Sequence, residues 1–183
     1  VLGGHTNNNT LNKDETAYVN EEKFINEIGG ELKYSITSNL TMDLTVNTDF
    51  AQVEADDQQV NLTRFSLFFP EKRMFFQESA SIFSYNLGGS SNLFYSRRIG
   101  LDEDGNQVRI YGGARVYGRI GKWDMGFLNM QTANSEHLPS ENFGVLRMRR
   151  QVINPNSYVG GILTTRLGAN GNYNTAYGFD GII

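Results

Sequence analysis

The feature that most constrains this chain is a series of long segments in which apolar and polar side chains alternate. In segment 40–46, leucine, methionine and valine occupy every second position, and threonine and aspartate fill the positions between them. A period of two is the geometry of a β-strand, because successive side chains point to opposite faces. A strand that crosses a bilayer needs about 9–11 residues, whereas most strands in soluble sheets have about 5–6. The pattern therefore predicts the antiparallel strands of an outer-membrane barrel.

Alternation recurs along the chain, and turn signals such as Ser38-Asn39 and Gly121-Lys122 join several of the segments. This arrangement indicates neighbouring antiparallel strands in up-and-down order. With one more crossing inside residues 51–92, it gives about eight or nine strands, close to the smallest membrane barrels of about eight. The last strand stops without a turn, so we expect the N-terminal part of a larger barrel. The predicted strands are residues 31–36, 40–50, 93–100, 110–120, 123–132, 143–152, 158–167 and 177–183.

Loop lengths assign the segments to the two sides of the predicted wall. Membrane barrels have short turns on one side and long loops on the other, so segment 51–92 must start on one side and end on the other. We expect it to cross the wall near residues 74–85 or to return through the lumen, with a short internal helix at residues 58–69. Residues 1–28 are polar and predict a linker or loop, and residues 29–183 form the predicted barrel.

Composition is compatible with this interpretation and excludes several classes of protein. Hydrophobic residues make up 39% of the chain and the mean hydropathy is −0.42, but only every second residue of a barrel strand faces lipid. No run of about 18 apolar residues predicts a transmembrane helix. The chain has no cysteine, which excludes disulfides and thiolate metal sites, and its net charge of −4 argues against nucleic-acid binding.

Three blocks are more specific than generic β-sequence: residues 47–56, 60–65 and 68–78, which read NTDFAQVEAD, VNLTRF and FFPEKRMFFQE. They closely resemble a family of uncharacterised outer-membrane proteins that are often labelled as carrying a family-nine-type carbohydrate-binding domain. Residues 94–100, 126–128 and 157–161 are also similar to that family, and the resemblance covers residues 29–183. It implies an outer-membrane barrel that follows a periplasmic or surface β-sandwich module. It supplies no catalytic residues.

Six arginines form the strongest candidate cluster for a function. A charge that faces lipid costs about 2–4 kcal/mol at mid-bilayer, so arginines on strands are expected on the lumen face. There they would anchor the acidic segment 51–78, attract anionic solutes, or form ion pairs between strands that fill the interior. We favour anchoring over solute selection. The cluster comprises Arg97, Arg98, Arg115, Arg119, Arg147 and Arg149.

The internal segment carries its own charged and aromatic side chains, and the rings are expected to pack as a plug or wall. An acidic group after the second predicted strand is a candidate for contact with Ca²⁺ or sugar hydroxyls, because hard cations take several carboxylate oxygens. Ion pairs with nearby basic residues are the alternative for that group. The segment residues are Arg64, Phe65, Phe69, Glu71, Lys72 and Arg73, and the acidic group is Glu54, Asp56 and Asp57.

No other motif predicts catalysis, a cofactor or a metal site. Glu71 and Glu78 have the residue types of a glycosidase pair, but Pro70 disfavours the helix that would bring them together, and ion pairing is the preferred interpretation. Residues 102–106 depart from the calcium-loop pattern, since the twelfth position of the loop is Gly113 rather than glutamate.

We therefore expect a non-enzymatic barrel in the bacterial outer membrane that anchors a carbohydrate-handling module or passes solute. We expect outer-membrane lipid to surround the barrel. Carbohydrate and other outer-membrane proteins are candidate partners, and no cofactor is expected. Two alternatives stay open. One is a soluble carbohydrate-binding β-sandwich, in which a second sheet would cover the apolar faces. The other is a membrane-associated glycoside hydrolase.

Overall fold

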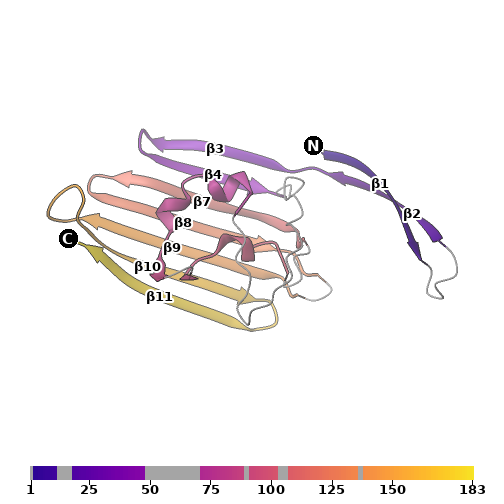
Figure 1. Cartoon of the computed structure of the whole chain (residues 1–183). Coiled ribbons are helices and arrows are strands. Elements are labelled where there is room, and N and C mark those ends of the chain that lie inside the picture. The colour runs from indigo at the N-terminus through magenta and orange to yellow at the C-terminus, as the bar shows by residue number, and fades with distance from the viewer. Residues whose placement is uncertain (1, 12–17, 48–70, 89–90, 103–106, 136–137) are drawn as a thin grey trace.

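The computed structural model describes residues 2–11, 18–47, 71–88, 91–102, 107–135 and 138–183. Within these ranges, seven long strands form one antiparallel sheet in the order β11-β10-β9-β8-β7-β4-β3 (Figure 1). The two outer strands, β3 and β11, each have only one neighbour among the described residues, so the sheet is open. The strands are β3 (Gly30–Thr37), β4 (Leu40–Val46), β7 (Ile110–Ile120), β8 (Trp123–Thr132), β9 (Glu141–Gln151), β10 (Tyr158–Gly168) and β11 (Tyr173–Ile182).

The all-β antiparallel prediction is confirmed, and most strands fall where the alternation placed them. The bounds of β7 and β8 agree with the prediction, and both expected turns lie between paired strands. The final strand, β11, starts at Tyr173 rather than at Tyr177, because polar residues such as Asn174 and Thr175 also pair their backbones with β10. Backbone hydrogen bonds need no apolar side chain, so the polar start of this strand reads as a loop in the sequence.

Two elements predicted between β4 and β7 are wrong. Residues 74–85 hold two short helices, α1 (Met74–Gln77) and α2 (Ala80–Phe83), instead of a crossing, and residues 93–100 hold the 3₁₀ helix η1 (Ser96–Arg98) instead of a strand. Strand β4 pairs directly with β7. The chain leaves β4 and enters β7 at the same end of the sheet. The two wrongly predicted crossings therefore do not change the direction expected for β7 and the strands after it. The predicted helix at 58–69 lies outside the described residues.

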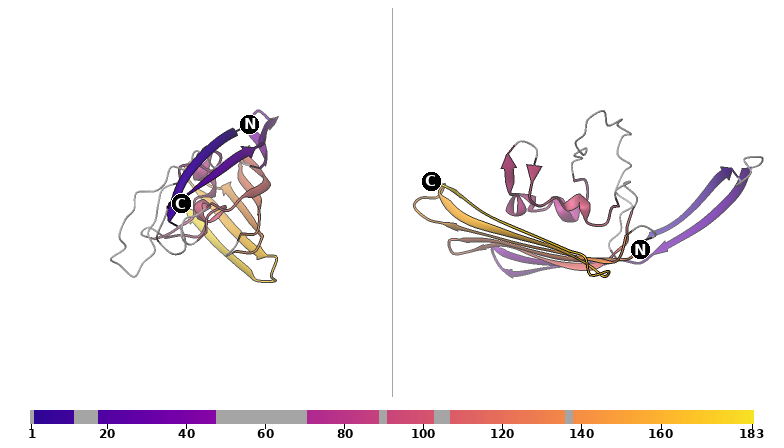
Figure 2. Two further views of the ribbon diagram at one scale, coloured as in Figure 1. Left: turned by 90° about the vertical axis from the view of Figure 1, so that its right-hand side faces the viewer. Right: turned by 90° about the horizontal axis from the view of Figure 1, so that it is seen from below.

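Residues 71–88 and 91–99, called the strap here, lie against one side of the sheet, which is its concave side in Figure 2. The strap includes α1, α2, η1 and the small strands β5 (Asn86–Gly88) and β6 (Ser91–Asn92). Its buried side chains, among them Phe76, Phe83 and Ile99, join Leu128 and Val145 of the sheet in the main hydrophobic core. Burying one such side chain contributes about 1.5–3 kcal/mol. Apolar packing therefore holds the strap on the sheet, and this explains why residues 93–100 do not form a strand.

The N-terminal region differs from the linker or loop predicted for residues 1–28. Strands β1 (Leu2–Leu11) and β2 (Tyr18–Glu27) pair as an antiparallel hairpin that extends beyond one end of the sheet (Figure 1). Polar composition alone does not separate a solvated hairpin from a loop, because the hairpin is built from backbone hydrogen bonds. No helix in the described ranges is long and apolar enough to span a membrane.

Candidate functional site

The strand register gives the sheet two chemically different faces. One row of side chains crosses all seven strands on the face away from the strap, and every member of the row is apolar or aromatic. The adjacent row, on the face that the strap covers, contains a lysine, an aspartate and an arginine at one end. The outer row is Tyr34, Met42, Val116, Phe127, Leu146, Leu163 and Tyr177, and the inner row is Lys33, Asp43, Arg115, Leu128, Val145, Thr164 and Ala176.

The outer face is exposed even at the centre of the sheet. Phe127 and Leu146 have strands on both sides, yet they are 43% and 38% exposed. No described residue covers them. Single exposed apolar residues are common on soluble proteins, but contiguous apolar patches larger than a few hundred Å² are seldom exposed on soluble monomers. Other exposed apolar residues on this face are Leu32, Ile36, Ile120, Trp123, Val159, Leu167 and Phe179.

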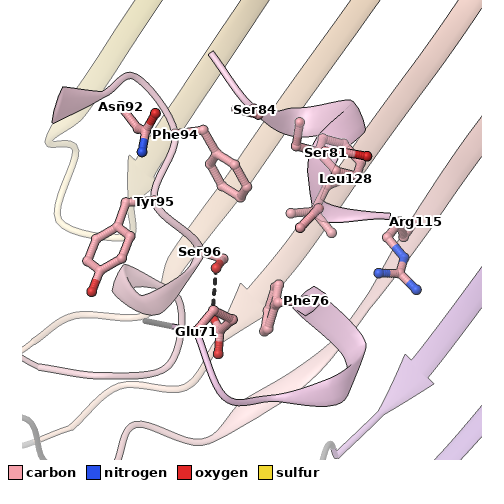
Figure 3. A pocket seen from close by; sticks show the side chains of 12 residues that line it. Glu71, Phe76, Ser81, Ser84, Asn92, Phe94, Tyr95, Ser96, Arg115 and Leu128 are labelled. Carbon is pink, nitrogen blue, oxygen red and sulfur yellow. Dashed lines mark hydrogen bonds between the residues drawn. The ribbon is translucent and has the colours of Figure 1, made fainter. Parts of the chain in front are cut away.

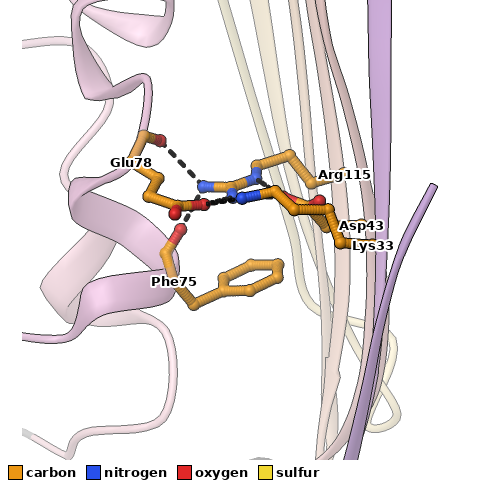
Figure 4. A network of polar contacts seen from close by, with 5 residues as sticks. All are labelled: Lys33, Asp43, Phe75, Glu78 and Arg115. Atoms are coloured by element: carbon orange, nitrogen blue, oxygen red, sulfur yellow. Dashed lines mark hydrogen bonds and ion pairs between the residues drawn. The ribbon is translucent and has the colours of Figure 1, made fainter. Parts of the chain in front are cut away.

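The covered face holds the strap through Arg115, whose side chain is 2% exposed (Figure 4). Its guanidinium donates hydrogen bonds to the carboxylate of Asp43 on β4 and to the backbone carbonyls of Phe75 and Glu78. The Glu78 carboxylate accepts a further hydrogen bond from Arg115 at 3.2 Å and one from Lys33 Nζ at 2.7 Å. One arginine therefore ties together β4, β7 and the strap.

A second buried arginine closes the strap on itself. Arg73 forms paired hydrogen bonds of 2.8 Å with both carboxylate oxygens of Glu71, and it also donates to the backbone carbonyls of Ser96 and Ile99. The Ser96 hydroxyl donates to the same carboxylate at 2.6 Å. These contacts connect the beginning of the strap to its end, so the segment is a closed loop rather than a trailing chain.

Both glutamates of the strap are stabilised in their charged form. Burial alone would raise the pKa of Glu71, but the hydrogen bonds and charge of Arg73, together with the Ser96 hydroxyl, outweigh it and lower that pKa. The hydrogen bond from Lys33 lowers the pKa of Glu78, and the charge of Arg115 adds to the effect. Both carboxylates therefore form ion pairs with basic residues, Glu71 with Arg73 and Glu78 with Lys33 and Arg115. Ion pairing was the preferred interpretation of these two glutamates.

A second charged cluster crosses the covered face near the short turns. Arg119 on β7 donates to both carboxylate oxygens of Asp124 on β8, at 2.6 and 3.1 Å. Arg147 on β9 forms a paired interaction with Asp180 on β11, and its guanidinium lies 5.2 Å from the ring centre of Tyr85 in the strap. The Tyr85 hydroxyl also donates to the backbone carbonyl of Phe179 at 2.8 Å.

The six predicted arginines divide into two groups. The four that lie on strands share the covered face, as their register with Asp43, Asp124 and Asp180 requires. Arg97 and Arg98 lie instead in η1 of the strap, the first buried and the second exposed. Lys72 is an exposed residue of the strap. The remaining predicted site residues lie outside the described residues: Glu54, Asp56, Asp57, Arg64, Phe65 and Phe69.

Sequence reasoning missed the carboxylates that pair with these arginines. Asp43 occupies a polar position in the alternation of β4, and Asp180 occupies the same kind of position in β11. An acidic residue between apolar neighbours on a predicted barrel strand was a usable signal, because it must face the same side as the arginines. Tyr85 carried no such signal, since its contacts depend on the path of the strap.

A pocket of about 340 Å³ lies between the strap and the sheet (Figure 3). Aromatic side chains such as Phe83, Phe94 and Tyr95 line it together with several serine hydroxyls. Its two charged members, Glu71 and Arg115, already form the ion pairs described above. The pocket therefore presents rings and hydroxyls, and neither charged member is free for acid–base chemistry. The described residues contain no group of three or more metal-ligating side chains.

The model of the family described as Domain of unknown function (DUF5916) matches residues 8–137. No curated protein and no solved structure matches the chain.

Proposed function

We propose that this chain, which belongs to the DUF5916 family of unknown function, forms part of the wall of an outer-membrane β-barrel, with the strap on its lumen side. The observation that carries the proposal is the apolar row that crosses all seven strands on the exposed face. In a barrel this row contacts lipid tails, and the opposite face meets the lumen. Alternation of this kind along strands of ten or eleven residues, such as β7 and β8, matches the length that a tilted strand needs to cross the hydrocarbon core.

The charges of the sheet support the same orientation. Arg115 and Arg147, the most deeply buried charged residues of the sheet, lie on the covered face and pair with Asp43 and Asp180. An unpaired charge on the other face would cost about 2–4 kcal/mol at mid-bilayer. A soluble β-sandwich would need a second sheet of similar width over the apolar face. The other sheets among the described residues have two strands each.

The open edges add a requirement to the proposal. Strands β3 and β11 each have one edge without a neighbour among the described residues, and unpaired backbone groups inside lipid cost several kcal/mol each. We therefore propose that further strands pair with these two edges and close the barrel.

The strap supports an anchoring role for the arginines more strongly than solute selection. Arg115 directs hydrogen bonds at two backbone carbonyls of the strap, which is the contact expected of an anchor. The proposed function is accordingly that of a membrane anchor with an internal strap. We propose that this anchor carries a carbohydrate-handling module, and this part of the proposal rests only on the family resemblance of residues 47–56, 60–65 and 68–78.

Two neighbouring residues of β3 provide a matched test. Tyr34 and Ser35 are both exposed and lie on opposite faces of the sheet. In a barrel, Tyr34→Lys puts a charge into lipid and lowers the free energy of unfolding in vesicles by about 2–4 kcal/mol. Ser35→Lys faces the lumen, and its expected effect is within about 0.5 kcal/mol.

The measurement is urea unfolding of the full chain after refolding into phosphatidylcholine vesicles, with flotation of the vesicles to confirm insertion. Equal effects of the two lysines would contradict the proposal. A chain that remains a monodisperse monomer without detergent and does not float with vesicles would favour the soluble β-sandwich.

A further inference from the structure

The charged cluster near the short turns contains more positive than negative charge. Arg119, Asp124 and Arg149 lie in one row across β7, β8 and β9, and Asp180 continues the row on β11. Arg147 joins the cluster from the next inward position of β9 through its pair with Asp180. Three arginines thus face two aspartates, and one positive charge has no matching carboxylate within the cluster.

The hydrogen bonds identify the arginine that is left over. Both oxygens of Asp124 accept from Arg119, and both oxygens of Asp180 accept from Arg147. Arg149 lies between these pairs. Its nearest carboxylate oxygen, Asp124 Oδ2, is 3.8 Å away, which is too far for a hydrogen bond. Its Nε is buried and has no hydrogen-bond partner among the described residues.

The side chain of Arg149 is nevertheless held in place and open to a ligand. Its stem passes over Gly160, where a Cβ would lie 2.8 Å from Arg149 Cγ. Its guanidinium lies 5.4 Å from the ring centre of Tyr158. The side chain is 22% exposed, so the guanidinium is supported on one side and accessible on another. A planar, pre-positioned guanidinium with free donors is the group that best binds a planar or tetrahedral oxyanion through two parallel hydrogen bonds.

We propose that Arg149 is the centre of a binding site for a small oxyanion, a carboxylate or a phosphate, on the covered face of the sheet. Arg119 and Arg147 keep the two aspartates occupied, so that the charge of Arg149 is available to the ligand. The site requires only the strands β7 to β11 and does not depend on whether the sheet is part of a membrane barrel.

The test is a titration of the full chain in detergent micelles with inorganic phosphate and, separately, with acetate, followed by the arginine Nε–H signals in ¹⁵N NMR. Sodium chloride at equal ionic strength is the reference. The Arg149 signal, assigned by its loss in Arg149→Lys, is expected to shift and saturate at millimolar anion. The two probes show whether phosphate or carboxylate is preferred.

Two arginines on the same face provide the matched variants. Arg149→Gln is expected to weaken binding about tenfold or more, because it removes the charged donors. Arg166→Gln removes the same charge from the pair with Glu141 and is expected to leave the affinity unchanged. Asp124→Asn removes the negative charge that lies beside both Arg119 and Arg149 and is expected to tighten binding severalfold.

Saturable binding that disappears in Arg149→Gln and persists in Arg166→Gln supports the site. Absence of a saturable shift, or an equal loss in both variants, overturns it. Vesicle flotation is measured separately, on the same variants refolded into phosphatidylcholine vesicles without detergent. A chain that floats but binds no anion refutes this site and leaves the proposed function intact, and the reverse result refutes only the membrane location.

Discussion

Among single substitutions of charged residues on the covered face of the sheet, Arg115→Met is expected to lower the free energy of unfolding most. Arg115 is almost fully buried, and its partner Asp43 has one carboxylate oxygen that already lacks a hydrogen bond among the described residues. Arg115→Met leaves the buried Asp43 carboxylate without its ion-pair and hydrogen-bond partner, and only the more distant charge of Lys33 remains near it. Removing one partner of a buried pair costs about 3–5 kcal/mol. By contrast, Arg119 is 62% exposed in its pair with Asp124, and Arg119→Met should cost at most about 1 kcal/mol.

Two assays separate the effect on the sheet from the effect on the strap. Urea unfolding of the full chain measures the sheet, and trypsin cleavage after Lys72 or Arg73 measures release of the strap. Arg115→Met should lower stability and speed cleavage, above all after the buried Arg73. The double variant Arg115→Met/Asp43→Leu should recover most of the stability, because an apolar pair replaces the buried charge. The strap of the double variant should stay open to trypsin, since the backbone carbonyls that Arg115 holds lose their donor. Equal stability losses in Arg115→Met and Arg119→Met would refute the reasoning.

Three further changes test how the strap is held. A Cβ at Gly126 would lie 2.9 Å from Phe83 Cε1, so Gly126→Val should destabilise strap docking by about 1–3 kcal/mol, seen as faster trypsin cleavage in the strap. The folded pKa of Glu71 lies below its ordinary value of 4.5. Its stabilising contribution is therefore complete above that pH and is lost as the pH falls further. Protection of the strap from an acid-active protease such as pepsin should decline below pH 4.5, and this decline should be smaller in Glu71→Gln, in which Glu78 still responds to acid. Tyr85→Phe removes the hydrogen bond to the Phe179 carbonyl and should cost about 0.5–1.5 kcal/mol in urea unfolding.

The sheet could be predicted from the sequence because the alternation that indicates each strand, and the short turns that join strands, involve only residues close together in the chain. Strands β7 and β8 are joined by the Gly121-Lys122 turn, and from Gly112 onward their residues pair in a regular register. Each position then determines the face of the next, so the shared face of Arg115 and Arg147 follows from counting residues along single strands.

The strap could not be predicted in the same way. Phe76, Phe83 and Ile99 pack against β8 and β9, which follow them in the chain, so their environment is set by residues that no local pattern connects to them. Short apolar runs of this kind are ambiguous between strand and helix. The partners of the arginines were missed for a related reason, since Asp180 lies 33 positions from Arg147.

The direct pairing of β4 with β7 has a consequence for how the chain folds. Strands β7 to β11 are successive hairpins, and each needs only a short loop to close before its hydrogen bonds form. Joining β4 to β7 must close the segment from Val46 to Ile110, and the entropy lost on closing a loop increases with its length. The meander β7–β11 is therefore expected to assemble first. The strap would then settle on it, and the β3–β4 hairpin would add last, with Arg115 already in place to receive Asp43.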